Sequence, residues 1–134
     1  TALDAARELA TCPVIGIGQA AYYLAAAAGE RFSVVTTLEV SVPILEANIQ
    51  DYGLGEKLVK VRASGVPVLA LEHDPDAATN QVIEEIKKAA QEDQVDCVVL
   101  GCGGMVDIHR GSHHSLGTRV IDGVRAAASF ASQF

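Results

Sequence analysis

Hydrophobic positions recur along this chain with two different spacings, which alternate from one segment to the next. Short apolar runs are typical of strands buried on both faces of a sheet, and apolar residues three and four positions apart are typical of amphipathic helices. Apolar runs predict strands at residues 12–17, 31–36, 67–71, 96–100 and 119–121, and an alternating segment predicts an edge strand at residues 57–62. The pattern therefore predicts a chain rich in short, buried strands.

Helical spacing fills the segments between these strands. The longest helix opens at Asp74, with Pro75 near its first position and Asp76 in its first turn, and residues of these types favour a helix start. Its apolar stripe consists of Val82, Ile83, Ile86, Ala89 and Ala90. The other predicted helices are residues 1–10, residues 18–29, a helix from residue 41 or 42 to 52, a helix that starts at Gly104, and residues 124–131.

The alternation of strands and helices predicts an α/β fold with three layers, in which helices flank a mostly parallel sheet. No linker, repeat or low-complexity tract divides the sequence, so residues 1–134 are predicted to form a single α/β unit. Ligands of such sheets bind beyond the carboxyl ends of the strands. Three segments follow predicted strands in this way: residues 16–18, Thr36 with Thr37, and residues 101–104.

The composition limits what the chain binds. The 134 residues are 49% hydrophobic but only 4% aromatic, with no tryptophan, which predicts a core of aliphatic and alanine side chains. A net charge of −7 gives no electrostatic footprint for nucleic acid or for anionic membranes. No apolar run reaches the roughly 18 residues of a membrane span, and the first residues lack the pattern of a signal peptide. We therefore expect a cytoplasmic protein without nucleic-acid or membrane partners.

The three cysteines, Cys12, Cys97 and Cys102, do not form the pattern of a disulfide framework, because their number is odd and the last two flank one predicted strand. There is no Cys-x-x-Cys pair, and the histidines of the segment HRGSHH lack the spacing of metal ligands, so no metal site is predicted. Cys97 is predicted to face the sheet interior as a small hydrophobic side chain. Cys12 precedes a proline and is not expected to have a chemical role.

Cys102 lies in the segment VVLGCGGM, where a buried strand ends and a helix is predicted to begin. The free amides and the dipole of a helix start lower the pKa of a thiol, which makes the thiolate available near neutral pH. The neighbouring Gly101, Gly103 and Gly104 allow the backbone to approach a small ligand and its N–H groups to face a negatively charged oxygen. These features alone leave two interpretations of Cys102 open: a reactive thiol, and a buried structural cysteine in a tight turn.

Two other strand ends also have a functional and a structural interpretation. The segment GIGQAA matches the G-x-G-x-x-A fingerprint of dinucleotide-binding folds, but the next strand ends in Thr36 and Thr37 instead of the acid that would bind a ribose. The nicotinamide-binding interpretation is therefore weak. The paired hydroxyls of Thr36 and Thr37 suit a carboxylate or imide oxygen, although β-branched residues also simply complete a strand.

Five ordered segments together resemble the hydantoin and allantoin racemases of the aspartate/glutamate racemase superfamily: ARELATCPVIGIGQAA, RFSVVTT, VRASGVPVLALE, VVLGCGGM and RVIDGV. The resemblance implies two similar α/β domains that face each other across a cleft, and an isomerase that works without cofactor or metal. It also implies two cysteines, one from each domain, that transfer protons on opposite faces of the substrate's α-carbon. The matching positions are Cys102 for the second cysteine, Thr36 and Thr37 for substrate-contacting threonines, and Gly101, Gly103 and Gly104 for the backbone around the thiol.

The chain departs from the family pattern at its start. The first cysteine of the family lies a few residues upstream of the stretch that matches Thr1 to Asp4, and neither Cys12 nor Cys97 matches it. Residues 1–134 are therefore expected to correspond to the C-terminal half of a two-domain racemase, to pair with an N-terminal domain, to form a homo-oligomer and to be inactive alone. The alternatives are an arylmalonate-decarboxylase-like enzyme with a single catalytic cysteine and a non-catalytic nucleotide-binding α/β module.

Overall fold

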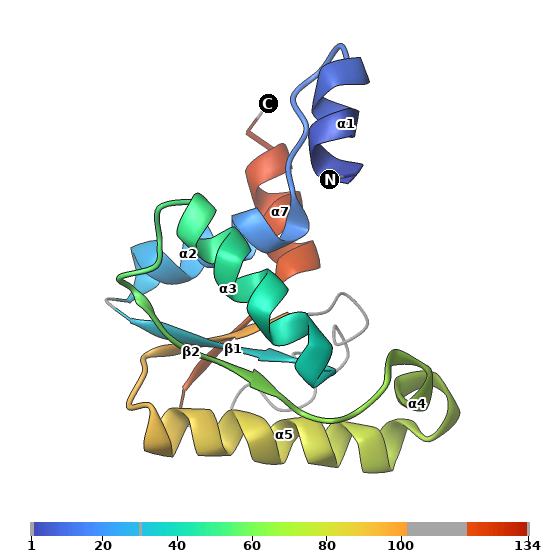
Figure 1. Cartoon of the computed structure of the whole chain (residues 1–134), viewed down its shortest axis with the longest axis vertical. Helices are drawn as coiled ribbons and strands as arrows, with labels where there is room; N and C mark the ends of the chain where they lie inside the picture. Colours follow the sequence, from blue (N-terminus) through green and yellow to red (C-terminus); the bar gives the residue numbers. More distant parts are fainter. Residues whose placement is uncertain (1, 30, 102–117, 134) are drawn as a thin grey trace.

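Four parallel strands form the centre of the structure, a computed structural model that describes residues 2–29, 31–101 and 118–133 (Figure 1). They are β1 (Phe32–Thr36), β2 (Leu58–Ala63), β3 (Cys97–Leu100) and β4 (Arg119–Asp122), in the spatial order β2-β1-β3-β4. Every neighbouring pair in this order is parallel. The predicted parallel sheet is confirmed, and the segment predicted as an edge strand is β2, at one edge of the sheet.

Helices cover both faces of the sheet, which confirms the predicted three layers (Figure 1). On one face lie α2 (Ile17–Ala28), α3 (Val42–Asp51) and α7 (Gly123–Ala131), and on the other lies the long α5 (Pro75–Glu92). The remaining described helices are α1 (Ala2–Leu9), the short 3-10 helix η1 (Glu39–Ser41) and α4 (Val68–His73). The helices predicted at residues 1–10, 18–29, 41–52, from Asp74 and at 124–131 are thus confirmed. The helix predicted from Gly104 lies outside the described residues.

The strands supply two separate cores, because their side chains alternate between the two faces of the sheet. Val34 and Val99 pack beneath α2 and α3, whereas Val35 and Val98 pack against α5. Small side chains let α2 approach the sheet closely, and these are the buried alanines Ala20, Ala21 and Ala25. The predicted aliphatic, alanine-rich core is confirmed.

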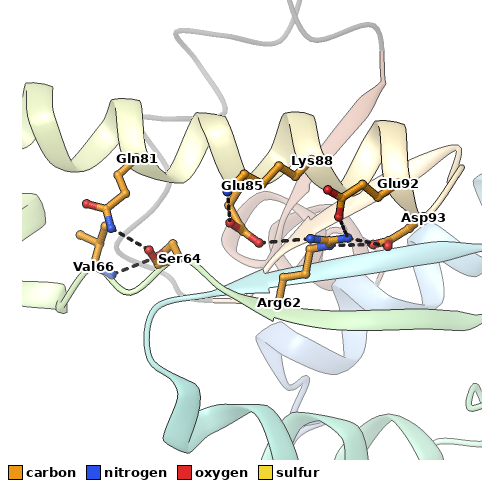
Figure 2. A network of polar contacts seen from close by, with 8 residues as sticks. All are labelled: Arg62, Ser64, Val66, Gln81, Glu85, Lys88, Glu92 and Asp93. Carbon is orange, nitrogen blue, oxygen red and sulfur yellow. Dashed lines mark hydrogen bonds and ion pairs between the residues drawn. The ribbon is translucent and has the colours of Figure 1, made fainter.

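A buried ion-pair network fastens the end of α5 to the sheet (Figure 2). The guanidinium of Arg62 on β2 donates to both carboxylate oxygens of Asp93, from Nε at 2.9 Å and from Nη2 at 2.7 Å. It also donates to Glu85 at 3.3 Å and to Glu92 at 2.8 Å, and the Ser33 hydroxyl donates to Asp93 at 2.8 Å. The hydrogen bonds from Arg62 hold the pKa of the Asp93 carboxyl below its ordinary value. The network therefore joins α5 to β1 and β2 through a pair that is largely buried, Arg62 with Asp93, and through the more exposed Glu85 and Glu92.

The strand predicted at residues 12–17 is wrong. The chain forms no strand before α2, and α2 itself begins at Ile17, inside the predicted strand. Pro13 has no amide hydrogen to donate to a sheet, and the described sheet, with the order β2-β1-β3-β4, does not include this segment. Ile15 packs instead against the core beneath α2 and α3, and the Val14 carbonyl accepts a hydrogen bond from Arg7 Nε at 3.3 Å. The apolar run is thus partly buried without joining the sheet.

The strand predicted at residues 67–71 is also wrong, because this segment opens α4. Gly65, with φ of +77°, adopts a left-handed conformation that turns the chain out of the sheet after β2. Val66 and Ala70, four residues apart, then both pack against the core on the α5 face. Val66 precedes α4 and lies in the turn after Gly65, whereas Ala70 belongs to α4 itself. The apolar run therefore covers the end of this core as a turn followed by a short helix.

Candidate active site

The carboxyl ends of β1 and β3 lie at a topological switch point of the sheet. The chain passes from β1 to β2 on one side and then returns to β3 on the other side of β1. Open parallel sheets bind ligands in the crevice at such a point, because the two connections leave the strand ends in opposite directions. Thr36 and Thr37 stand at the end of β1, and Gly101 follows β3. Two of the three predicted strand ends therefore meet where a ligand is expected.

The backbone of Thr36 and Thr37 is held firmly while their hydroxyls stay free. Both residues are buried, and their carbonyls accept hydrogen bonds from the amides of Ser64 and Gly65 at 2.9 and 2.8 Å. The Gln81 side chain of α5 holds this turn by donating to the Ser64 carbonyl at 2.9 Å (Figure 2). Within the described part of the chain, neither threonine hydroxyl has a hydrogen-bond partner. The backbone of the pair is thus held in place by hydrogen bonds, and two hydroxyls are available to a ligand.

Gly101 marks a close approach between the ends of β1 and β3. Its amide donates to the Val35 carbonyl at 2.8 Å. A Cβ atom added at Gly101 would lie 3.1 Å from Val34 Cγ1 and 3.2 Å from both Thr36 Cβ and the Val35 carbonyl oxygen. These separations are shorter than the roughly 3.5–4.0 Å of an ordinary carbon contact. A side chain at this position would force the neighbouring atoms to shift by a few tenths of an ångström, and with glycine the wall of the crevice beside Thr36 is formed by backbone.

Gly101→Ala is expected to lower the free energy of unfolding by about 1–3 kcal/mol, because the added methyl group overpacks the junction of β1 and β3. Urea denaturation followed by circular dichroism measures this change. Gly18→Ala is the matched control, since a Cβ there meets Tyr22 only at ordinary distances of 3.4 to 3.6 Å. If Gly101→Ala unfolds at the same urea concentration as the unsubstituted protein, the close approach does not demand glycine.

A hollow of about 420 Å³ opens beside Gly101, between the first turn of α2 and one side of α3. Its walls come from several elements: Leu3 of α1, residues 15–18 and Tyr22 at the start of α2, Leu45, Asn48 and Tyr52 at α3, and Gly101. Residues 16–18 were predicted to reach this edge as a strand end. They do reach it, but as the start of a helix, so Gly101 lies beside both the start of α2 and the end of β1.

Asp122 is a buried acid at this edge that the sequence analysis did not single out. It is 3% exposed and pairs in register with Leu100, the residue before Gly101. Its Oδ1 accepts a hydrogen bond from the Arg125 amide at 2.9 Å and so caps α7, whereas its Oδ2 has no partner among the described residues. An acid that ends an apolar strand and precedes a helix is a capping signal, and this signal in RVIDGV could have identified the residue.

Neither of the two described cysteines, Cys12 and Cys97, lines this hollow. Cys97 is fully buried within β3, and desolvation raises the pKa of its thiol, so it remains protonated and inert at neutral pH. Cys12 is exposed on the connection before α2. The predicted interior position of Cys97 is confirmed. Cys102, Gly103 and Gly104 lie outside the described residues, so their assignment to the site remains a prediction.

The dinucleotide fingerprint lacks its structural context. The segment GIGQAA opens α2 but follows no strand, whereas the fingerprint needs a tight turn between a strand and a helix. In the part of the chain that the structure describes, no three His, Cys, Asp or Glu side chains gather to hold a metal ion. Across the same residues, no helix combines the length and the apolar character needed to cross a membrane.

Comparisons with known proteins agree with this geometry. The sequence matches the Asp/Glu/hydantoin racemase family over residues 1–131. It is 49% identical over 129 residues to a hydantoin racemase from Rhizobium meliloti, an alignment that covers 96% of this chain and 54% of that protein.

Two solved structures share the fold. The allantoin racemase from Klebsiella pneumoniae superposes with a TM-score of 0.94 at 40% identity, over 98% of this chain and 54% of the other. The allantoin racemase from Pseudomonas fluorescens superposes with a TM-score of 0.92 at 38% identity, over 98% of this chain and 56% of the other. The chain therefore spans about half the length of the relatives it matches.

Proposed function

Because the chain belongs to the Asp/Glu/hydantoin racemase family, we propose that it forms the C-terminal half of a cofactor-independent racemase that acts on 5-substituted hydantoins or allantoin. The observation that carries the proposal is the junction of β1 and β3, where Gly101 lies against Thr36 at the switch point of the sheet. Cys102 follows Gly101 in the sequence, and we propose that its thiol acts at this crevice, where Thr36 and Thr37 supply hydroxyls and Gly101 supplies a backbone wall.

The proposed reaction inverts one carbon by moving one proton off and another on. Cys102, as thiolate, removes the proton from the carbon beside the ring carbonyl, and the electron pair of the broken C–H bond moves onto the carbonyl oxygen. A second thiol on the opposite face returns a proton to that carbon, which leaves the second cysteine as thiolate. Thr36 and Thr37 hold the ring oxygens, and the backbone at Gly101, Gly103 and Gly104 stabilises the developing negative charge.

We assign the second cysteine to a segment outside residues 1–134, since the chain spans about half of its relatives' length. Exposed apolar residues just beyond the end of β1 support contact with such a segment or with another copy: Leu38, Val40 and Ile44. Large exposed apolar side chains in one region are typical of a surface that another domain covers. The functional unit is therefore an N-terminal domain and residues 1–134 facing each other, in a homo-oligomer.

Racemisation in deuterated water tests the proposal. A single enantiomer of a 5-substituted hydantoin is incubated with the full-length enzyme, and optical rotation is recorded together with the NMR signal of the ring C–H. Two-sided proton transfer predicts that rotation disappears while deuterium enters the inverted product. The 134-residue chain alone is expected to leave the rotation at its spontaneous rate, because a single thiol acts on one face only. Failure of the full-length enzyme to racemise either hydantoins or allantoin would contradict the proposal.

A further inference from the structure

The first turn of α2 presents free hydrogen-bond donors to the hollow beside Gly101. The N-cap of α2 is Gly16, which has no side chain to cap the helix. Within the described chain, the amides of Ile17, Gly18 and Gln19 have no hydrogen-bond acceptor. By contrast, α7 starts at the same edge of the sheet with its first turn capped by Asp122. The N-terminus of α2 is therefore open toward a ligand.

The Tyr22 hydroxyl independently points to a ligand at the same place. Tyr22 is 3% exposed, and its ring stacks on Phe32 with centroids 6.2 Å apart. Its side chain runs back toward the start of α2, as helical side chains do, and its hydroxyl lies 3.5 Å from the Cβ position of Gly18. No described residue bonds to this hydroxyl. Tyr22 lines the hollow beside Gly101, so an acceptor that a ligand places there can receive the hydrogen bond of this hydroxyl.

The polar side chains that line the hollow, among the described residues, belong to Tyr22, Asn48 and Tyr52, and each of them can donate a hydrogen bond. Burial, with the nearby Tyr52 as a second cause, raises the pKa of Tyr22 to about 12, so that its hydroxyl keeps its proton at neutral pH. The carboxamide of Asn48 on α3 lines the same hollow, and no described lining residue is an acid. Since the chain carries a net charge of −7, a hollow lined by donors and free of carboxylates is suited to an oxygen acceptor.

We infer that the hollow formed by Gly16, Ile17, Gly18, Tyr22 and Asn48, the α2 subsite, binds an sp² oxygen of the substrate or product beside the reacting centre. The inference rests on the proposed function. It names the part of the site that binds the end of the ligand farther from the thiol. Gly101 lines the same hollow, so a ligand held there extends to the position that precedes Cys102. Two classes of compound carry such an oxygen: a hydantoin, the substrate and product of the proposed reaction, through its ring carbonyl, and an N-carbamoyl amino acid, the ring-opened form that the racemisation itself does not produce, through its carboxylate.

Titration of the ¹⁵N-labelled chain with hydantoin and, separately, with N-carbamoylglycine tests the α2 subsite by NMR. The amide signals of Ile17 and Gly18 are expected to shift in a saturable manner. Tyr22→Phe keeps the ring that stacks on Phe32 and is expected to weaken binding about five- to tenfold, as the loss of one hydrogen bond does. Tyr23→Phe is the matched control, because the Tyr23 hydroxyl donates elsewhere, to the Tyr52 carbonyl at 3.0 Å; its affinity is expected to stay within about twofold.

Asn48→Asp separates the two sources of the oxygen and is a second variant should Tyr22→Phe fold poorly. A negative charge in the hollow is expected to abolish binding of N-carbamoylglycine if its carboxylate is the bound group, and to weaken hydantoin more mildly if a neutral carbonyl is bound. Shifts confined to Thr36, Thr37 and Gly101, or Tyr22→Phe binding as tightly as the unsubstituted chain, would overturn the inference and leave the proposed function intact. No shift anywhere with either probe would also overturn the inference, whereas the proposed function is tested separately by racemisation with the full-length enzyme.

Discussion

Cys102→Ser is expected to lower the rate of hydantoin racemisation by the full-length enzyme about a thousandfold, within the range that general acid–base groups contribute. A serine hydroxyl does not ionise near neutral pH, so it cannot remove the proton as a thiolate does. The hydroxyl also donates its proton less readily to the carbanion-like intermediate. Polarimetry on each enantiomer separately measures the loss, and it is expected in both directions because the two cysteines exchange roles with substrate handedness.

The matched control is Cys12→Ser, which makes the same chemical change at an exposed position away from the strand ends. We expect it to retain full activity. Exchange of the ring C–H with deuterated water gives a second readout, since Cys102→Ser leaves only one thiol and still permits slow exchange without inversion. A Cys102→Ser enzyme that keeps more than about a tenth of its activity would assign the proton transfer to another group.

The sequence pattern predicted the fold wherever an apolar segment could find its partner locally. β1, β3 and β4 are short, mostly buried strands that each contain consecutive apolar residues, and α5 carries a single apolar stripe after a proline-containing start. The two wrong strands, at residues 12–17 and 67–71, are apolar runs of the same kind. Both contain a proline, and neither is a strand of the described sheet. An apolar run indicates burial, but only the tertiary arrangement decides whether burial occurs in a sheet or beneath it.

The candidate site also contains residues that the sequence pattern predicts and others that depend on the tertiary arrangement. Parallel strands end at one edge, so the convergence of Thr36, Thr37 and Gly101 could be predicted from the βα alternation alone. Tyr22 could not be predicted, because it lies on the buried face of an alanine-rich helix, where the pattern indicates only core packing. Its hydroxyl is a candidate ligand donor only because Gly18, one turn earlier, and Asn48, on another helix, border the same hollow. Such contacts between elements distant in sequence leave no local signal.

Arg62→Met is expected to lower the free energy of unfolding by about 3–5 kcal/mol, the range for removing one partner of a buried ion pair. The side chains of Arg62 and Asp93 are each 7% exposed. In the unsubstituted protein, Arg62 Nη2 lies 2.7 Å from Asp93 Oδ1 (Figure 2). Methionine fills a similar volume but leaves the Asp93 carboxylate buried without this partner. Urea denaturation at neutral pH measures the loss. Lys87→Met is the matched control, because Lys87 forms only an exposed pair with Glu84 and should change stability by less than about 1 kcal/mol.

A double variant shows whether the charge left behind causes the loss. Arg62→Met combined with Asp93→Asn removes both charges, so it is expected to be more stable than the sum of the two single losses predicts. Strict additivity would mean that Arg62 acts through its contacts with Glu85 and Glu92, or through packing of its stem, instead of through Asp93.

Acidification provides an independent test of the same pair, and its sign follows from the direction of the pKa shift. The pKa of Asp93 is lowered in the folded protein, chiefly by hydrogen bonds from Arg62, whereas an unfolded aspartate titrates near 3.9. Between these values the unfolded chain binds the proton and the folded chain does not, so stability is complete above about pH 5 and falls as the pH drops toward the folded pKa. Asp93→Asn removes this dependence. We therefore expect the unsubstituted protein to lose more unfolding free energy than Asp93→Asn between pH 5 and pH 3 in urea titrations. Parallel losses in the two proteins would mean that Asp93 is not ion-paired in solution.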